Sequence, residues 1–188
     1  ATIHVLDETT INKIAAGEVV ERPASVVKEL IENSIDAGAT SIEIEIGEGG
    51  SAYMRITDNG KGMTEEDARL AVLRHATSKI QSVEDLFDIA SLGFRGEALA
   101  SIASVSHFVL TTRTVEQDLG TRILIDGGTF TDCIPYGAAP GTTIEVKELF
   151  FNTPARRKFL KTERTESSKI QDIVGKLALS NPHIAFKL

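Results

Sequence analysis

Residues 29–38 read Glu-Leu-Ile-Glu-Asn-Ser-Ile-Asp-Ala-Gly, and this stretch decides the fold predicted for the chain. It is the second half of an amphipathic helix, because apolar residues recur at a spacing of three to four at positions 26, 27, 30 and 31. Pro23 favours the first turn of a helix, where its missing N–H costs nothing. Gly38 favours a helix end in the left-handed conformation. The sequence therefore predicts a helix over residues 23–37.

Two polar residues on this helix point to chemistry. Glu29 and Asn33 are four residues apart and project from one face, with Asp36 roughly in line. A carboxylate can take a proton from water. A carboxamide oxygen can ligate Mg²⁺, which binds substrate phosphates through its remaining positions. A solvated helix face is the commoner explanation of such a pair taken alone, so the rest of the chain has to decide between them.

Composition describes an ordinary globular chain. Its 188 residues are 41% hydrophobic and 25% charged, which is enough to bury a core as one domain. The net charge of −7 argues against a surface devoted to nucleic acid, although a local basic patch stays open. Cys133 is the single cysteine, so a disulfide framework is excluded and a reducing compartment is favoured. No stretch has the length of a membrane span, and we expect no secretory signal.

Alternating apolar residues follow the helix. They run over residues 42–46 and 52–56 on either side of a glycine turn at Gly49 and Gly50, and they predict an antiparallel hairpin packed on the helix. This order favours α+β layering over a βαβ crossover. Further strands are predicted, as is a helix start at Pro154 and a helix over the last part of the chain. These segments are residues 107–114, 121–126, 129–134 and 142–147 for the strands and 165–180 for the helix.

A turn with two glycines follows the second strand of the hairpin. Asp58 ends that strand, and Gly60 and Gly62 flank Lys61. Glycines let another molecule approach the backbone closely, and a carboxylate at a strand end can accept a hydrogen bond from an exocyclic amine. A plain turn is the alternative. Gly-Thr-Thr at 141–143 begins a later strand, where either a threonine hydroxyl faces the same pocket as Asp58 or the residues simply start the strand.

Two further segments have a functional and a structural explanation each. Residues 74–95 form a long polar segment with glycines at its end, which predicts either a lid over phosphates that closes on the following helix start or an ordinary surface loop. A basic cluster predicts either nucleic-acid phosphate binding or a solvated helix face. Its candidate DNA contacts are Arg156, Arg157, Lys158 and Lys161.

Several enzyme classes are excluded by what the sequence lacks. It contains no G-x-x-x-x-G-K-[ST] phosphate loop, no G-x-G-x-x-G after a strand, and no H-E-x-x-H or cysteine cluster for zinc. Its four histidines are scattered, which gives a Ser-His-Asp triad little support.

Taken together, the motifs resemble those of the GHKL ATPase superfamily. They are Glu29…Asn33, Asp58-x-Gly60-x-Gly62, Gly-Phe-Arg-Gly-Glu-Ala-Leu at 93–99 and Gly-Thr-Thr at 141–143. Within the superfamily the chain resembles the MutL family of DNA mismatch repair proteins over essentially its whole length. The stretches that carry this second resemblance are residues 14–23, 74–79, 93–99 and 151–158.

The resemblance implies a fold and a role for each motif. It implies an α+β two-layer sandwich, with a mixed, mostly antiparallel sheet packed on helices. Residues 1–22 would be an N-terminal arm and 23–188 the ATP-binding domain, with the transducer domain that follows in the family absent. Glu29 would be the general base and Asn33 the Mg²⁺ ligand. Asp58 would read adenine with help from Thr143, and Gly60 and Gly62 would keep the base pocket open. The residues that would cradle the phosphates are Thr77, Ser78, Lys79, Gly93, Phe94, Arg95, Gly96, Glu97, Ala98 and Leu99.

The resemblance also implies a function. ATP and Mg²⁺ would be the cofactors, and hydrolysis would be slow because a lysine of the following domain is missing. ATP would drive self-dimerisation, which would couple a mismatch-recognition protein to strand incision. DNA binding would be weak and non-specific, no membrane would be involved, and the location would be the bacterial cytoplasm or a eukaryotic nucleus. Two alternatives stay open: another GHKL enzyme, such as a topoisomerase subunit or a histidine kinase, and a non-catalytic interaction module.

Overall fold

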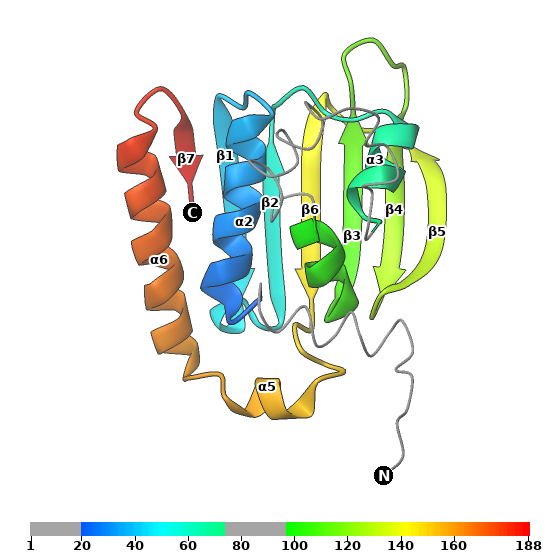
Figure 1. Cartoon of the computed structure of the whole chain (residues 1–188). Helices are drawn as coiled ribbons and strands as arrows, with labels where there is room; N and C mark the ends of the chain where they lie inside the picture. The colour runs from blue at the N-terminus through cyan, green and yellow to red at the C-terminus, as the bar shows by residue number, and fades with distance from the viewer. Residues whose placement is uncertain (1–19, 74–96) are drawn as a thin grey trace, which may run out of the picture.

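A seven-stranded sheet forms one layer of the molecule, and helices lie over one of its faces (Figure 1). The computed structural model describes residues 20–73 and 97–188. The strand order is β5-β4-β3-β6-β2-β1-β7. The strands are β1 (Ser41–Gly47), β2 (Tyr53–Asp58), β3 (His107–Arg113), β4 (Gly120–Asp126), β5 (Thr129–Tyr136), β6 (Gly141–Lys147) and β7 (Ala185–Lys187). The helices are α2 (Pro23–Asp36), α3 (Glu65–Ala71), α5 (Pro154–Lys158) and α6 (Glu163–Ser180), and residues 97–104 are also helical.

The opening helix and hairpin form as the sequence predicts. Strands β1 and β2 pair antiparallel with Ile44 opposite Ile56, so their apolar residues share one face. The apolar stripe of α2 packs against that face, and the side chains of Val27 and Ile31 are fully buried. Burying a side chain of this size contributes roughly 1.5–3 kcal/mol. The hairpin and α2 thus form the part of the core that fixes the position of the polar face of α2.

The later strands complete a mixed sheet. All neighbouring pairs are antiparallel except β1 and β7, which run parallel. The predicted fold class is therefore confirmed. Strand β5 extends to Tyr136, past the predicted end at residue 134, because β5 lies at the edge of the sheet, where Pro135 costs no ladder hydrogen bond. Helix α6 begins two residues earlier than predicted, because the Thr162 side chain caps it by accepting from the Thr165 N–H at 3.2 Å.

Two predicted segments lie outside the described residues. They are all but the last residues of the N-terminal arm, at 1–19, and the stretch from 74 to 96 that contains most of the predicted lid. Across the described ranges 20–73 and 97–188, no helix is long and apolar enough to cross a membrane.

Gly62 is needed by the packing of the backbone. Its φ is +68°, and a Cβ built on it would lie 1.8 Å from the carbonyl oxygen of Arg113, at the end of β3. Gly38 also has a positive φ, +76°, but no atom lies within 4 Å of a Cβ at that position. A substitution at Gly38 therefore meets only the cost of the left-handed backbone, whereas one at Gly62 also meets a steric collision.

We expect Gly62→Ala to destabilise the fold far more than Gly38→Ala. The left-handed conformation costs an alanine roughly 1–2 kcal/mol at either site. At Gly62 the backbone of β3 must also move, which adds about 1–3 kcal/mol, as overpacking does. Urea unfolding of both variants measures the difference, and equal losses of stability would contradict this account of Gly62.

Candidate functional site

A pocket of about 260 Å³ lies where α2, the ends of β2 and β6, and the 97–104 helix meet. Its walls are mostly apolar, with a few polar groups directed into it. The described residues that line it are Leu30, Asn33, Ser34, Asp36, Ala37, Ile56, Asp58, Lys61, Gly62, Met63, Ala71, Leu99, Thr142 and Ile144. An apolar cavity with a small number of placed polar groups is the usual form of a small-molecule site.

Asp58 is the buried acid of this pocket. It ends β2 with a relative exposure of 9%, and three groups donate hydrogen bonds to its carboxylate. The Ser34 hydroxyl donates to Oδ2 at 2.6 Å, and the backbone N–H groups of Gly60 and Thr142 donate to Oδ1 at 2.8 and 3.3 Å. These contacts come from α2, from the glycine turn and from β6, so the carboxylate is fixed from three sides. Oδ2 keeps a lone pair for a donor that enters the pocket.

Burial raises the pKa of Asp58 above its ordinary value of 3.8, and the hydrogen bonds from Ser34, Gly60 and Thr142 oppose that rise. The desolvation of the carboxylate is thus the larger effect. A carboxylate in a pocket whose pKa is raised by burial is a candidate functional group.

Asn33 and Glu29 stand on one face of α2, one helical turn apart, as the spacing predicts. Both are half-buried, and Asn33 lines the pocket together with Asp58. Glu29 is not among the described residues that line this pocket. The pocket therefore surrounds Asp58 and Asn33, and Glu29 lies outside its described lining, one turn nearer the N-terminal end of α2.

Thr142, and not Thr143, is the threonine that faces the pocket. In the β2–β6 ladder Thr142 pairs with Asp58 and Thr143 with Thr57, and side chains alternate between the faces of a sheet. Thr143 therefore points to the face without Asp58, where its hydroxyl donates to Thr57 Oγ1 at 3.3 Å. The prediction that placed Thr143 beside Asp58 is wrong by one residue, because the sequence did not fix the pairing register.

The two glycines of the turn have packing roles that the sequence did not reveal. Gly62 lines the pocket, but a side chain there would strike the backbone of Arg113. A Cβ on Gly60 would lie 2.8 Å from the Cβ of Ala37 and 2.9 Å from its carbonyl oxygen. These glycines bring the turn against α2 and β3, so they shape the pocket wall by close backbone packing.

The predicted phosphate cradle is described only in its last part. The residues that lie outside the described ranges are Thr77, Ser78, Lys79, Gly93, Phe94, Arg95 and Gly96. Of the rest, Leu99 lines the pocket, Ala98 is fully buried and Glu97 is half-buried, all three on the 97–104 helix.

Ser34 is the functional residue that sequence reasoning missed. It is 3% exposed and holds Asp58 through the shortest of the three hydrogen bonds. A signal was present, because Ser34 continues the buried stripe of α2 one turn after Leu30, where a polar residue needs a partner.

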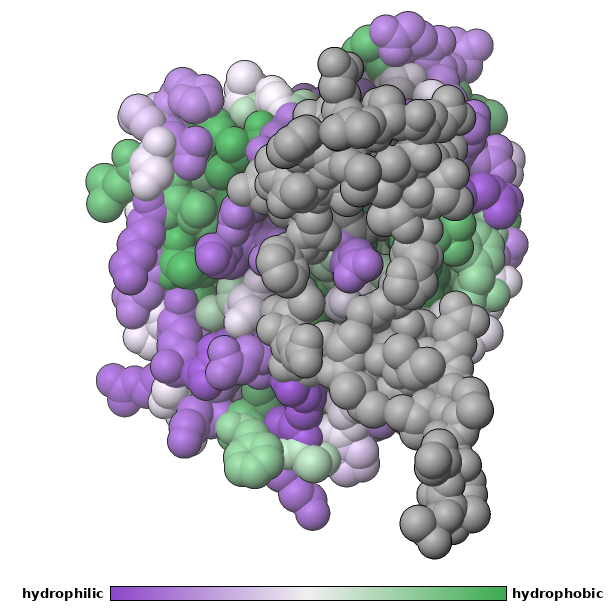
Figure 2. All heavy atoms as spheres, in the orientation of Figure 1, coloured by the Kyte–Doolittle hydropathy of each residue, from purple (hydrophilic) through white to green (hydrophobic). Residues whose placement is uncertain are grey.

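In the basic cluster, two side chains contact other parts of the protein and the two lysines are exposed to solvent. Arg156 is half-buried and donates to the carbonyl oxygen of Val20 at 2.8 Å. Arg157 lies 3.5 Å from the Glu148 carboxylate. Lys158 and Lys161 are exposed, and Figure 2 shows hydrophilic side chains at the start of α6 and both hydrophilic and hydrophobic ones over α5.

Comparison with known proteins identifies the family. A model of the histidine kinase-, DNA gyrase B- and HSP90-like ATPases matches residues 21–126, which is more than half of the chain. The chain belongs to this family, the GHKL ATPases. The match spans α2, the hairpin, the glycine turn and the 97–104 helix, so it includes the described site apart from β6.

Within the GHKL ATPases, the relatives of this domain are MutL proteins. DNA mismatch repair protein MutL of Caldanaerobacter subterraneus subsp. tengcongensis is 60% identical over 185 residues, which is 98% of this chain and 31% of that protein. MutL of Xanthomonas axonopodis pv. citri is 58% identical over 99% of this chain and 30% of its own length. The chain corresponds to the ATPase region of MutL and spans about a third of the length of these curated relatives.

Solved structures agree with this assignment. The Aquifex aeolicus MutL ATPase domain complexed with ADP superposes with a TM-score of 0.70 at 38% identity, over 89% of this chain and 59% of that one. The N-terminal domain of a DNA repair protein superposes with a TM-score of 0.80 at 32% identity, over 97% of this chain and 53% of that one.

The raised pKa of Asp58 predicts how the stability of this GHKL domain changes with pH. An aspartate whose native pKa is raised gives its stability below pH 3.8 and loses it as the pH rises through the native pKa. In Asp58→Asn the amide oxygen still accepts from Gly60 and Thr142, and nothing titrates. The free energy of unfolding of Asp58→Asn minus that of the wild type should therefore increase from about pH 3.5 to 7. Urea unfolding across this range measures it, and a difference that falls would mean that hydrogen bonding outweighs desolvation.

Proposed function

We propose that this domain binds ATP, hydrolyses it slowly with Mg²⁺, and serves as a nucleotide-driven dimerisation switch in DNA mismatch repair. The observation that carries the proposal is the shared pocket of Asp58 and Asn33, with Glu29 one turn farther along the same helix. The ADP complex of the related Aquifex aeolicus domain supports a nucleotide as the ligand.

Asp58 would recognise the base. Its Oδ1 is occupied by two backbone N–H groups, whereas Oδ2 holds one hydrogen bond, from Ser34. The 6-amino group of adenine is a donor that Oδ2 can accept, and guanine carries a carbonyl oxygen at that position. The apolar walls formed by Leu30, Ile56 and Ile144 would cover the faces of the ring. A fixed acceptor in an apolar slot thus selects adenine.

Asn33 would hold Mg²⁺ and Glu29 would act on water. No group of three or more His, Cys, Asp or Glu in residues 20–73 and 97–188 is arranged to bind a metal. A single carboxamide fits Mg²⁺, which takes its other ligands from phosphates and water and would neutralise phosphate charge. Glu29, one turn away, would orient the attacking water and accept its proton. The chemistry would rest on positioning and electrostatics, as in other phosphoryl transfers.

The role in the whole protein extends this proposal. A lysine from the domain that follows in the family would complete the γ-phosphate contacts, and hydrolysis without that contact would be slow. ATP-dependent self-association would pass the signal from a mismatch-recognition protein to strand incision. Sedimentation of the full-length protein with a non-hydrolysable ATP analogue tests the switch, and a monomer at saturating analogue would refute it.

DNA binding would be weak, non-specific and carried by the exposed lysines of the α5–α6 segment. Lys158 and Lys161 are exposed, and Arg157 is in part neutralised by Glu148. The net charge of −7 would keep binding to duplex DNA weak. The contacts would be to phosphates alone, so the affinity would fall steeply with salt.

Calorimetry of ADP binding tests the pocket. Asp58→Asn replaces the acceptor Oδ2 with a donor, so we expect affinity to fall by roughly 10- to 100-fold, the worth of a hydrogen bond to a charged group. Asn33→Ala should weaken binding with Mg²⁺ much more than binding without it. If neither substitution weakens binding, the pocket has been assigned wrongly.

A threonine pair supplies the control for the same experiment. Thr142→Val removes a hydroxyl that lines the pocket, whereas Thr143→Val removes its neighbour on the other face of the sheet. Only the first should alter ADP affinity, and the reverse result would restore Thr143 to the site.

Turnover tests Glu29. Glu29→Gln keeps the size of the side chain but cannot accept a proton, so ATP hydrolysis should fall by about 10²–10⁴ while ADP affinity stays close to that of the wild type. Single-turnover hydrolysis with labelled ATP measures the loss. A wild-type rate no higher than that of the variant would favour the alternative of a non-catalytic interaction module.

A further inference from the structure

The N-terminal end of α2 has Pro23 at its first position but, in the part of the chain that the structure describes, lacks a capping side chain and acidic residues. The helix begins at Pro23, and among the described residues the N-cap residue Arg22 makes no side-chain capping bond. The first turn also carries no acidic residue. Capping side chains and acidic residues normally help to fix a helix start. Here Pro23 and the buried Val26 and Val27 do part of this, and a contact from another segment can add to them as a further anchor.

Arg156 supplies that anchor from a distant part of the chain. Its Nη1 donates to the carbonyl oxygen of Val20 at 2.8 Å, and its guanidinium carbon lies 5.9 Å from the centre of the Phe150 ring. Val20 is 1% exposed and Phe150 is fully buried. The backbone N–H of Phe150 in turn donates to the Val105 carbonyl at 2.7 Å. The anchor is therefore attached to the core.

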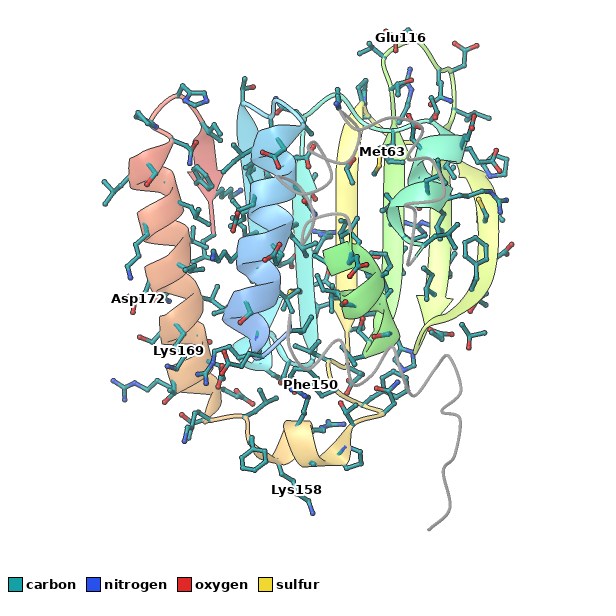
Figure 3. All side chains as sticks on the ribbon, viewed as in Figure 1. Met63, Glu116, Phe150, Lys158, Lys169 and Asp172 are labelled. Atoms are coloured by element: carbon teal, nitrogen blue, oxygen red, sulfur yellow. The ribbon has the colours of Figure 1, made fainter. Side chains whose placement is uncertain are left out.

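The other end of α2 is fixed at the pocket. Ser34 donates to Asp58 at 2.6 Å, and the Lys61 N–H donates to the carbonyl oxygen of Ala37, just past the helix end, at 2.9 Å. Figure 3 labels Met63, which lines the pocket, and Phe150 at opposite ends of the molecule. Glu29 lies between the two anchors of α2, so its position depends on both.

The same segment also holds the second helix of the pocket. Asn152 Nδ2 donates to the carbonyl oxygen of Ser104 at 2.9 Å, at the C-terminal end of the 97–104 helix. Leu99 of that helix lines the pocket. Residues 150–156 thus hold the far ends of both helices that line the site.

We propose that Arg156 is a positioning residue for ATP hydrolysis, which holds α2 at its N-terminal end and thereby places Glu29. This inference rests on the proposed function of Glu29. Base binding depends on the opposite anchor, where Asp58 is held by Ser34, Gly60 and Thr142. Loss of Arg156 therefore displaces the general base and leaves the base pocket intact. It also gives Arg156 a role other than the predicted DNA contact.

Arg156→Ala in the full-length protein tests the proposal through three measurements. We expect kcat to fall about tenfold or more, because a displacement near 1 Å can cost about 10²-fold. The Kd for ADP, measured by calorimetry, should stay within about twofold of the wild type. The base would bind at Asp58, at the other end of α2 from Arg156. Hydrogen exchange should rise at the amides of Val26 and Val27 and stay unchanged at Ile35.

Two further variants make the result specific. Arg164→Ala removes an exposed arginine of α6 and should change none of the three measurements. Arg156→Lys keeps the charge and N–H donors on a single nitrogen but lacks the planar fork, so it should keep more of kcat than the alanine variant. The lysine variant also carries the test if Arg156→Ala does not fold, because its kcat should still fall while its Kd does not.

Several outcomes would overturn the inference. They are an unchanged kcat in Arg156→Ala, a parallel loss of kcat and ADP affinity, and a loss of DNA affinity with kcat preserved. A separate result would remove its basis: a Glu29→Gln protein that hydrolyses ATP as fast as the wild type refutes the proposed function, whatever Arg156 does.

Discussion

The hydrogen bond from Ser34 to the buried carboxylate of Asp58 is the contact on which the site depends. It joins α2 to the end of β2 at 2.6 Å, beside the N–H groups of Gly60 and Thr142. A buried carboxylate without donors would be too costly to keep, so helix, turn and β6 must meet at this point. Three separate segments thus meet at Asp58, on one wall of the pocket.

Helix α2 has two functions that follow from its two faces. The apolar face, with Val27 and Ile31, packs on the hairpin, and this packing fixes the direction in which Glu29 and Asn33 project. The same helix then carries Ser34 to Asp58. In the proposed function, binding and hydrolysis would both depend on this one helix, so the contacts at its N-terminal end would matter as well as those at the pocket.

The local pattern of apolar residues predicts the helices and strands. It does not predict the pairing register of the strands, and the error in the site comes from that register. The 23–37 helix and the first hairpin follow from apolar periodicity, and Asp58 and Asn33 were expected to lie together. Thr143 was misplaced because a shift of one residue moves a side chain to the other face, and sequence alone does not fix pairing. The contact of Arg156 with Val20 is not predictable from the sequence, because the two residues are far apart in it, and the DNA contact predicted for Arg156 stays a prediction. Contacts between distant segments leave no local trace.

The collision at Gly62 has a consequence for how such sequences are interpreted. A side chain there meets the backbone of β3 whether or not a nucleotide is ever bound. Selection for folding alone would therefore preserve this glycine in a descendant that had lost catalysis, while its acid and amide on α2 drifted. The glycine motif in a new sequence therefore indicates the fold and common descent. Whether that protein could still hydrolyse ATP has to be judged from the residues at the positions of Glu29 and Asn33 on α2.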